Sequence, residues 1–243
     1  MFRQYSIDQA LALVLLPSVA VVLAVLYVVV VALQGRPFIF TSERMRSKDQ
    51  AFYLLKIRTM KLPEQSMNET ALGGDQKWRV TPVGAFLRRT RLDELPQIFN
   101  VLRGELRFVG PRPPLRKYVE QYPVLYGQVL ADTRPGITGL ATVILHAREE
   151  RLLSRCRTSA ETDAVYRRRC IPMKARLDLV YRDNRGWVLN AMILWMTFSR
   201  LLPRSLADMV AVKILWSPVV FRRITGGFYR DLGRAGEPMI DNA

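Results

Sequence analysis

The pattern of apolar and polar positions separates a long apolar start from a mixed remainder. Residues 10–33 carry no charged side chain. Folded as one helix they would extend about 36 Å, enough to cross a hydrocarbon layer of about 30 Å. The segment is too long for a secretory signal peptide and lacks its small-residue cleavage site. The sequence therefore predicts that the N-terminal part binds a membrane.

Pro17 interrupts this apolar segment, and two arrangements follow. A proline inside a helix removes a backbone hydrogen bond and introduces a kink. One arrangement is a kinked helix that spans the membrane. The other is a pair of helices, over about residues 7–16 and 18–34, that meet at an angle and leave on the same side. Basic residues flank both ends, so the positive-inside rule does not choose between them.

The residues that follow predict short strands and helices. Residues 38–42 and 51–58 are typical of two strands joined by a polar loop, which indicates a hairpin. The period of two in a strand places Lys56 and Arg58 on one face of the second strand. Thr81 before Pro82 is typical of a capped helix start.

A short amphipathic helix is expected after Asp93. Apolar residues recur at helical spacing over residues 95–102. Asp93 suits the N-cap, Pro96 the first turn and Gly104 the stop signal. The carboxylates would then lie at a helix N-terminus, where the helix dipole favours anions.

Further elements are predicted beyond this helix. Residues 106–109 indicate a short strand, and the prolines of residues 110–114 would hold Arg112 in a fixed position. Residues 114–129 predict a helix. Residues 186–199 are uncharged but too short to span a membrane, so they predict a core helix or an interfacial one.

Charge narrows the class of partner. The formal net charge is +16, which predicts an anionic partner such as nucleic acid, an anionic lipid surface or a phosphorylated substrate. No nucleic-acid-binding signature occurs, and such binding would leave the apolar segment unexplained, so no nucleic acid is expected as a partner. His146 is the only histidine, which argues against a histidine metal cluster and a Ser-His-Asp triad.

The densest candidate chemistry lies in residues 88–113, where adjacent carboxylates, Asp93 and Glu94, occur among arginines. Carboxylates can attack phosphorus or hold a cation, and guanidinium groups bind phosphate oxygens in pairs. The pattern therefore predicts a site for a metal-bound phosphate ester. Simpler roles stay open: helix capping for Asp93 and Glu94, loop cover for Arg112, a solvated strand face for Lys56 and Arg58, and bracing of a turn for Arg134.

These residues resemble the bacterial sugar transferases that begin glycan assembly on a polyprenol carrier, the monotopic phosphoglycosyl transferases. The resemblance covers about residues 8–202. Its blocks are G-R-P-F-I-F at 35–40, K-I-R-T-M at 56–60, T-P-V-G with F-L-R at 81–88, L-D-E-L-P-Q through V-G-P-R-P at 92–113, and R-P-G-I-T-G-L at 134–140. A looser match lies at residues 178–181.

The resemblance implies a reaction and a set of roles. A nucleotide diphosphate sugar, usually a UDP-sugar, would give its phosphosugar to undecaprenyl phosphate and release UMP. Asp93 would attack the sugar-proximal phosphate to form a covalent phosphosugar-enzyme, and the lipid phosphate would then attack that intermediate. Glu94 would bind Mg²⁺. The side chains implied to bind phosphates or the nucleotide are Lys56, Arg58, Arg88, Arg112 and Arg134.

The resemblance also implies an organisation. The fold class is α/β, with a small mixed catalytic domain of a β-hairpin and short helices over residues 37–205. Residues 1–36 would form a re-entrant membrane helix broken near Pro17, and interfacial amphipathic helices would lie on the same face. The extension at 206–243 has no counterpart in the minimal members of the family, and its mixture of apolar and basic residues predicts that it associates with the membrane. The implied location is the cytoplasmic face of the bacterial inner membrane, among membrane lipids. The oligomeric state stays open, a homodimer included.

Two departures from the family pattern bear on the site. Arg91 replaces a small hydroxyl residue that is common before the carboxylates, and Asn190 replaces an aspartate that is common in the late apolar helix. Neither removes a proposed reacting group. The alternative function is a non-catalytic, membrane-bound scaffold or regulator that keeps the fold, and neither the sugar nor the final glycan follows from the residues.

Overall fold

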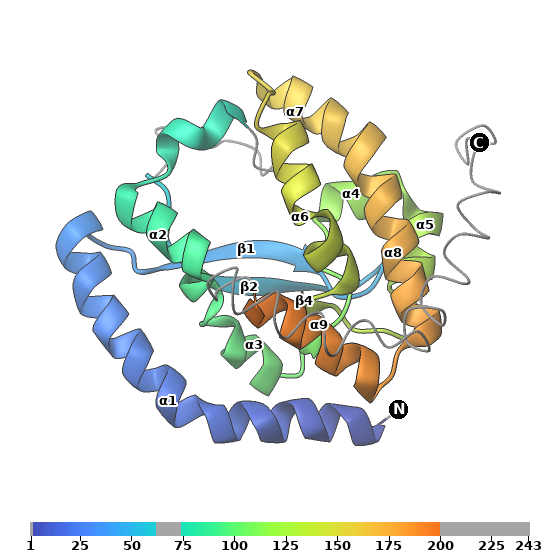
Figure 1. Cartoon of the computed structure of the whole chain (residues 1–243), viewed down its shortest axis with the longest axis horizontal. Helices are drawn as coiled ribbons and strands as arrows, with labels where there is room; N and C mark the ends of the chain where they lie inside the picture. Colours follow the sequence, from blue (N-terminus) through green and yellow to red (C-terminus); the bar gives the residue numbers. More distant parts are fainter. Residues whose placement is uncertain (1, 62–73, 200–243) are drawn as a thin grey trace. The chain divides into compact units, whose positions relative to one another are not determined.

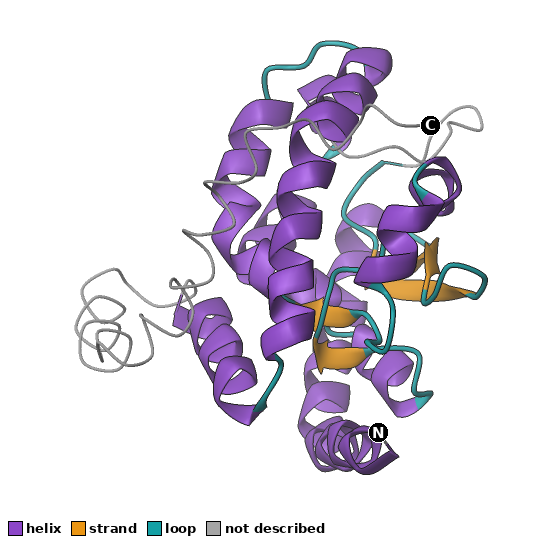
Figure 2. Ribbon diagram, turned by 90° about the vertical axis from the view of Figure 1, so that its right-hand side faces the viewer, coloured by secondary structure: helices purple, strands orange, loops and turns teal. Residues whose placement is uncertain are grey.

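The computed structural model describes residues 2–61 and 74–199. Helices dominate this part, and the strands are short (Figure 1; Figure 2). The helices are α1 (Phe2–Gln34), α2 (Pro82–Thr90), α3 (Gln97–Leu102), α4 (Arg116–Gln121), α5 (Pro123–Val129), α6 (Leu140–Leu153), α7 (Ser159–Val165), α8 (Ile171–Asn184) and α9 (Trp187–Ser199). The strands are β1 (Ile39–Met45), β2 (Ala51–Ile57), β3 (Arg107–Val109) and β4 (Gly136–Thr138). Shorter helical turns are η1 (Gly74–Arg79), η2 (Leu92–Glu94) and the π-helical η3 (Tyr166–Cys170).

The predicted hairpin is confirmed. β1 pairs antiparallel with β2, from Ile39 opposite Ile57 to Met45 opposite Ala51. The first strand extends to Met45, beyond the predicted end at 42. Separately, β3 pairs parallel with β4, so the strands of the described part form two two-stranded sheets. The fold is a helix-rich α/β arrangement with small sheets, as the sequence predicts.

Local sequence accounts for both ends of α2. The Thr81 hydroxyl accepts a hydrogen bond from the Gly84 N–H at 2.9 Å, and Pro82 occupies the first turn. The helix ends at Thr90, after which Arg91 adopts a left-handed conformation with a φ of 59°.

The predicted N-cap role of Asp93 is wrong. Asp93 lies within the 3₁₀ turn η2, and α3 begins only at Gln97. An N-cap side chain must accept from the N–H two or three residues later. Pro96 has no N–H, and the N–H of Leu95 donates to the Leu92 carbonyl at 3.2 Å. The predicted stop is confirmed, because Gly104 follows the last turn of α3 with a φ of 69°.

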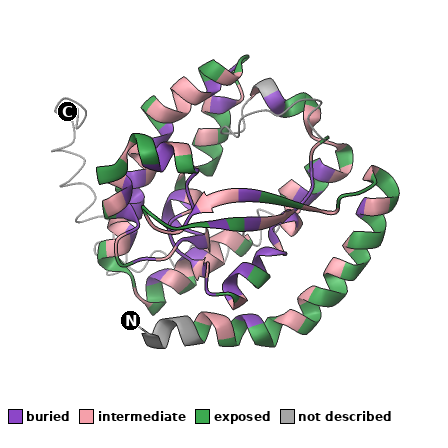
Figure 3. Cartoon of the chain, turned by 180° about the vertical axis from the view of Figure 1, so that it is seen from behind, coloured by how far each residue is buried: buried purple, intermediate pink, exposed green. Residues whose placement is uncertain are grey.

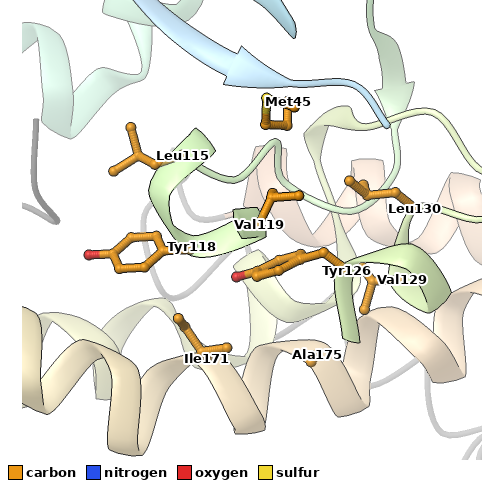
Figure 4. Close-up of a cluster of buried hydrophobic side chains, with 9 residues drawn as sticks. All are labelled: Met45, Leu115, Tyr118, Val119, Tyr126, Val129, Leu130, Ile171 and Ala175. Atoms are coloured by element: carbon orange, nitrogen blue, oxygen red, sulfur yellow. The ribbon is translucent and has the colours of Figure 1, made fainter. Parts of the chain in front are cut away.

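A buried apolar cluster joins the hairpin to the later helices (Figure 4). Its members come from β1, α4, α5, α8 and the segments next to α4 and α5. They are Met45, Leu115, Tyr118, Val119, Tyr126, Val129, Leu130, Ile171 and Ala175. The helix predicted over 114–129 is in fact two helices, because Tyr122 precedes Pro123 and leaves the helical region at φ −129°, ψ 61°.

The apolar N-terminal segment forms one helix through Pro17. Figure 1 shows α1 bent partway along its length. The Ser18 hydroxyl donates to the Leu15 carbonyl at 2.8 Å next to the proline. The expected break is therefore a bend in a continuous helix. Within the described residues, Ile7–Gln34 is the one stretch long and apolar enough to cross a membrane, by length and composition only.

Near its start, α1 bonds to the end of α3 and to β3. Asp8 Oδ2 lies 3.1 Å from the Arg107 Nε, and Asp8 Oδ1 accepts from the Phe108 N–H at 3.2 Å. Gln9 Nε2 donates to the Leu102 carbonyl at 2.9 Å.

Near its end, α1 bonds to the end of β2. Arg58 Nη2 donates to the carbonyls of Gln34 and Gly35 at 2.5 and 2.6 Å. Between its two ends, α1 carries mostly exposed residues (Figure 3). Val14 and Val21, for example, are 75% and 66% exposed. Both ends of α1 thus bond to the same compact unit while an apolar face remains uncovered.

The described residues up to Leu194 belong to one compact unit. The predicted late apolar helix is α9, in which Leu189 and Ile193 are buried and Trp187 is exposed. The predicted extension at 206–243 lies outside the described residues.

Candidate active site

The carboxylate of Glu94 contacts three cationic side chains. Its Oε1 lies 2.6 Å from Arg112 Nη2 and 3.1 Å from Lys56 Nζ, and its Oε2 lies 3.5 Å from Arg91 Nη1. Burial alone would raise the pKa of Glu94, but the charges of Arg112, Lys56 and Arg91 outweigh burial and hold this pKa well below its usual range. Glu94 is therefore ionised at neutral pH.

Asp93 is buried beside Glu94 in a different environment. Its residue is 7% exposed. No hydrogen bond or ion pair joins its carboxylate to another side chain of the described residues. Burial raises its pKa, the neighbouring charge of Glu94 adds to this, and the charges of Lys56, Arg88 and Arg112 oppose it. The site thus holds one carboxylate that is ion-paired, Glu94, and one buried carboxylate without an ion pair among the described side chains, Asp93.

Lys56 comes from β2, pairs with Glu94 and also interacts electrostatically with Asp93. Burial lowers its pKa, and the attraction of Glu94 opposes this shift. The neighbouring charge of Arg112 lowers the pKa further. A lysine in this position is a compact, partly desolvated charge of the kind that binds a phosphate oxygen.

Arg88 reaches the site because α2 packs directly on the backbone after β2. A Cβ at Gly84 would overlap the Thr59 carbonyl oxygen, so only glycine permits this approach. One turn later, Arg88 Nε donates to the Thr59 hydroxyl at 2.8 Å. Burial lowers the pKa of Arg88, and the charge of Asp93 opposes the shift.

Arg112 is positioned by the contact between its loop and β4. The N–H of Gly110 donates to the Thr138 carbonyl, and the N–H of Gly136 donates to the Pro111 carbonyl, each at 2.9 Å. A Cβ at Gly136 would overlap the Gly110 backbone, so the two chains touch without side chains between them. The Arg112 guanidinium also donates to a backbone carbonyl of β4, at 3.3 Å.

Asn100 is a positioning residue that the sequence analysis missed. It is fully buried in α3. Its Oδ1 accepts from the Leu55 N–H at 3.0 Å, and its Nδ2 donates to the Tyr53 carbonyl at 2.8 Å. These bonds attach β2, and hence Lys56, to the helix that follows the carboxylates. The available signal was an amide, Asn100, within the apolar repeat of residues 95–102.

The structure does not bring every predicted residue to the carboxylates. Lys56, Arg88 and Arg112 surround them. Arg58 instead binds the carbonyls at the end of α1. Arg134 donates to the Gly104 carbonyl and braces that turn.

The carboxylates fit a magnesium ion that arrives with phosphate ligands. Magnesium prefers oxygen ligands and is usually held by one or two carboxylates together with substrate phosphates. No group of three or more His, Cys, Asp or Glu side chains in the described part could hold a metal on its own. Glu94 would supply a protein oxygen, and the remaining ligands would come from substrate and water.

A buried carboxylate pair within a group of lysine and arginine side chains is chemically suited to binding phosphate esters. The comparisons with known proteins identify which class. A family model described as "Bacterial sugar transferase" matches residues 1–204, so the chain belongs to the bacterial sugar transferase family.

Several relatives carry names that state an activity. The UDP-glucose:undecaprenyl-phosphate glucose-1-phosphate transferase of Escherichia coli (strain K12) is 36% identical over 161 residues, which are 65% of this chain and 34% of that protein. A protein of the same name from Caulobacter vibrioides is 41% identical over 110 residues, 44% of this chain and 40% of that one. The UDP-N-acetylgalactosamine-undecaprenyl-phosphate N-acetylgalactosaminephosphotransferase of Aeromonas hydrophila is 39% identical over 114 residues, 44% and 26% of the two chains. The chain spans less than half the length of each of these relatives.

Proposed function

We propose that this chain transfers a phosphosugar from a UDP-sugar to undecaprenyl phosphate, giving a polyprenol-diphosphate-linked sugar and UMP. The observation that carries the proposal is the difference between the two buried carboxylates. Glu94 is ion-paired with three cations. The carboxylate of Asp93 forms no ion pair with a described side chain, so its oxygens can form a new bond. The donors and acceptor in the names of the relatives support the substrate classes.

The proposed reaction has two displacements at one phosphorus atom. In the first, an Asp93 oxygen bonds to the phosphorus that carries the sugar, the bond from that phosphorus to the UMP oxygen breaks, and UMP leaves. In the second, an oxygen of undecaprenyl phosphate bonds to the same phosphorus, and the bond to Asp93 breaks to restore the carboxylate. A carboxylate nucleophile replaces one difficult displacement with two easier ones.

The cations around Asp93 account for an attack of one anion on another. Lys56, Arg88 and Arg112 would bind the phosphate oxygens and offset their repulsion of the Asp93 carboxylate. A bound magnesium ion, with Glu94 as a ligand, would withdraw further charge from the pyrophosphate. Glu94 would stay ionised throughout because its pKa is held far below neutral pH.

The lipid substrate places this chemistry at a membrane, and α1 provides the attachment. Asp8 and Gln34 lie at opposite ends of α1, and both ends bond to the same compact unit. A straight crossing would put them on opposite sides of the bilayer. We therefore favour a re-entrant helix with both ends on the cytoplasmic face of the bacterial inner membrane, where UDP-sugars are present.

The test is UMP release from a panel of UDP-sugars with undecaprenyl phosphate and Mg²⁺, comparing wild type with Asp93→Asn. We expect lipid-dependent turnover with at least one sugar in the wild type and none in the variant. Arg89→Asn is the matched control, because Arg89 is exposed and contacts Phe86 rather than the carboxylates. It should keep its activity.

Stability separates loss of chemistry from loss of fold. Because burial disfavours the charged form of Asp93, Asp93→Asn should melt no lower than wild type. Equal UMP release by both proteins would remove Asp93 from the nucleophile role. A folded wild type that is inactive with every donor, yet binds the membrane, would favour the scaffold function.

A further inference from the structure

Arg91 has an unusual backbone and a central electrostatic position. It adopts the left-handed region at φ 59°, ψ 12°, where residues other than glycine and asparagine are uncommon. Its N–H donates to the carbonyls that end α2. The backbone is thus fixed as the cap of α2, and conformational preference alone would favour glycine or asparagine here. We therefore look to a contact of the side chain for the reason that arginine occupies this position.

The two oxygens of Glu94 are held unequally. Oε1 contacts Arg112 at 2.6 Å and Lys56 at 3.1 Å. Among the described side chains, the cation within ion-pair distance of Oε2 is Arg91, at 3.5 Å. This distance is at the long limit of a hydrogen bond. Oε2 is therefore the less tightly held oxygen, and Arg91 covers it.

A metal ion that uses Glu94 must take an oxygen that already has a cationic partner. Taking Oε1 would break the short bond to Arg112, whose loop is fixed against β4. Taking Oε2 requires only that the Arg91 side chain swing aside. Because that side chain is 27% exposed, it has room to leave without unfolding anything.

We propose that Arg91 is an exchangeable counter-cation, which occupies Oε2 of Glu94 in the free protein and yields that oxygen to a divalent metal arriving with the substrate pyrophosphate. The inference rests on the proposed function, since it takes Glu94 as the metal ligand. A free divalent ion must enter beside several cations and displace Arg91, which is unfavourable. An ion carried by pyrophosphate brings compensating negative charge and gives Arg91 a new anionic partner.

Arg91 would therefore couple metal binding to donor binding. The free protein would bind divalent metal weakly, and the nucleotide diphosphate would strengthen that binding. Removing the arginine should strengthen metal binding without nucleotide and reduce the gain that nucleotide provides. Arg91 acts here as a positioning residue, not as a reacting group.

The experiment measures Mn²⁺ binding by electron paramagnetic resonance, using the full chain in detergent micelles with and without UDP. The variants are Arg91→Asn and Arg91→Gly, which both suit the left-handed backbone, and Arg89→Asn, which removes the same charge from the same helix end. Without UDP, both Arg91 variants should bind Mn²⁺ about three- to fivefold more tightly than wild type, the range for a partly exposed ion pair. Arg89→Asn should bind as wild type does, and UDP should tighten wild-type binding more than it tightens binding by either Arg91 variant.

Three results would overturn the inference. Unchanged Mn²⁺ affinity in the Arg91 variants would show that Arg91 does not compete with the metal. An equal increase in Mn²⁺ affinity in Arg89→Asn would show that the overall positive charge, and not the Arg91 side chain, weakens metal binding. Mn²⁺ binding that is absent with UDP, or unaffected by Glu94→Gln, would remove Glu94 as the ligand. UMP release by the wild type reports separately on the transferase function, and circular dichroism melting verifies that each variant is folded.

Discussion

At the scale of single residues, the site depends on how two adjacent carboxylates respond to the same cations. Asp93 is buried without a hydrogen-bond partner among the described side chains, so burial dominates and its pKa rises. Glu94 is in direct contact with Arg112, Lys56 and Arg91, so their charges dominate and its pKa falls. A carboxylate with a raised pKa is more basic and thus a better nucleophile once ionised. This difference in pKa matches the two proposed roles.

The raised pKa of Asp93 predicts the acid side of the pH–rate profile. Attack requires the ionised form, so activity should fall as pH decreases through this pKa, which lies above the ordinary value of about 3.9. Lys56 lowers the pKa of Asp93, so Lys56→Met should move the acid limb of kcat/KM to higher pH, in addition to reducing the rate.

The measurement is UMP release against pH for wild type, Lys56→Met and Lys56→Arg. Lys56→Arg retains the charge and should keep the acid limb near its wild-type position. Lys48→Met removes a charge from an exposed loop and should leave the profile unchanged. An acid limb that does not move in Lys56→Met would contradict the assignment of that limb to Asp93.

At the scale of elements, the site requires that backbones meet without side chains between them. Gly84 allows α2 to lie against Thr59, and the glycines of the β3 and β4 loops allow the Arg112 loop to lie against β4. These close contacts bring α2 against the segment after β2 and the Arg112 loop against β4, so that side chains from separate elements meet at one site. The glycines in T-P-V-G and V-G-P-R-P are therefore part of the geometry of the site, although none carries a reacting group.

Gly84→Ala tests the first of these contacts. Its Cβ would overlap backbone atoms of Thr59, so α2 must shift and carry Arg88 away from the Thr59 hydroxyl. We expect a loss of about 1–3 kcal/mol in the free energy of unfolding and a larger proportional loss in kcat/KM.

The control is Gly127→Ala in α5, where an added Cβ would meet nothing within 4 Å. A helix interior favours alanine over glycine by about 1 kcal/mol, so this variant should be at least as stable as wild type and fully active. Denaturant unfolding monitored by circular dichroism measures both. Equal behaviour of the two variants would mean that α2 does not need its close contact.

The sequence was most informative where the signal is local. Thr81 before Pro82 predicts the start of α2, and Gly104 predicts the end of α3, because caps and stops depend on neighbours in the chain. The N-cap prediction for Asp93 is wrong because Pro96, three residues later, has no N–H to donate to its side chain. The break at Tyr122 was missed, although the residue before a proline is disfavoured in a helix.

Contacts between segments that are distant in the sequence were harder to predict from it. The period of two predicts Lys56 and Arg58 on one strand face, but β2 ends at Ile57, and of the two only Lys56 contacts Glu94. Arg58 binds the end of α1, and Arg134 binds the turn at Gly104. Which arginine meets a phosphate site and which meets a carbonyl depends on packing between elements, and neither composition nor periodicity contains that information.

At the scale of the whole molecule, the question is how α1 can enter a membrane while both of its ends stay bonded to the rest of the protein. The ion pair between Asp8 and Arg107 is largely buried, at 15% and 7% side-chain exposure. Separating such a pair leaves desolvated charges without each other and costs about 3–5 kcal/mol when one partner is removed. At the other end, Arg58 binds two carbonyls that terminate α1. A spanning helix would have to break one of these attachments, whereas a bent helix inserted from one side keeps both and presents its exposed apolar face to lipid.

We expect both ends of α1 to lie on the same side of the membrane as the carboxylates. Single cysteines at Ile7, Arg36 and Tyr53, in a chain whose buried Cys156 and Cys170 are replaced by alanine, report on the two helix ends and on β2. The three parent residues are exposed. In intact cells an impermeant maleimide should label none of them, and after lysis it should label all three at similar rates.

Labelling at Ile7→Cys alone in intact cells would establish a spanning helix. It would also require the Asp8–Arg107 pair to be broken in the membrane, so Asp8→Asn should then leave thermal stability unchanged. If the helix is re-entrant, Asp8→Asn should instead lower the melting temperature, because Arg107 would lose a buried partner.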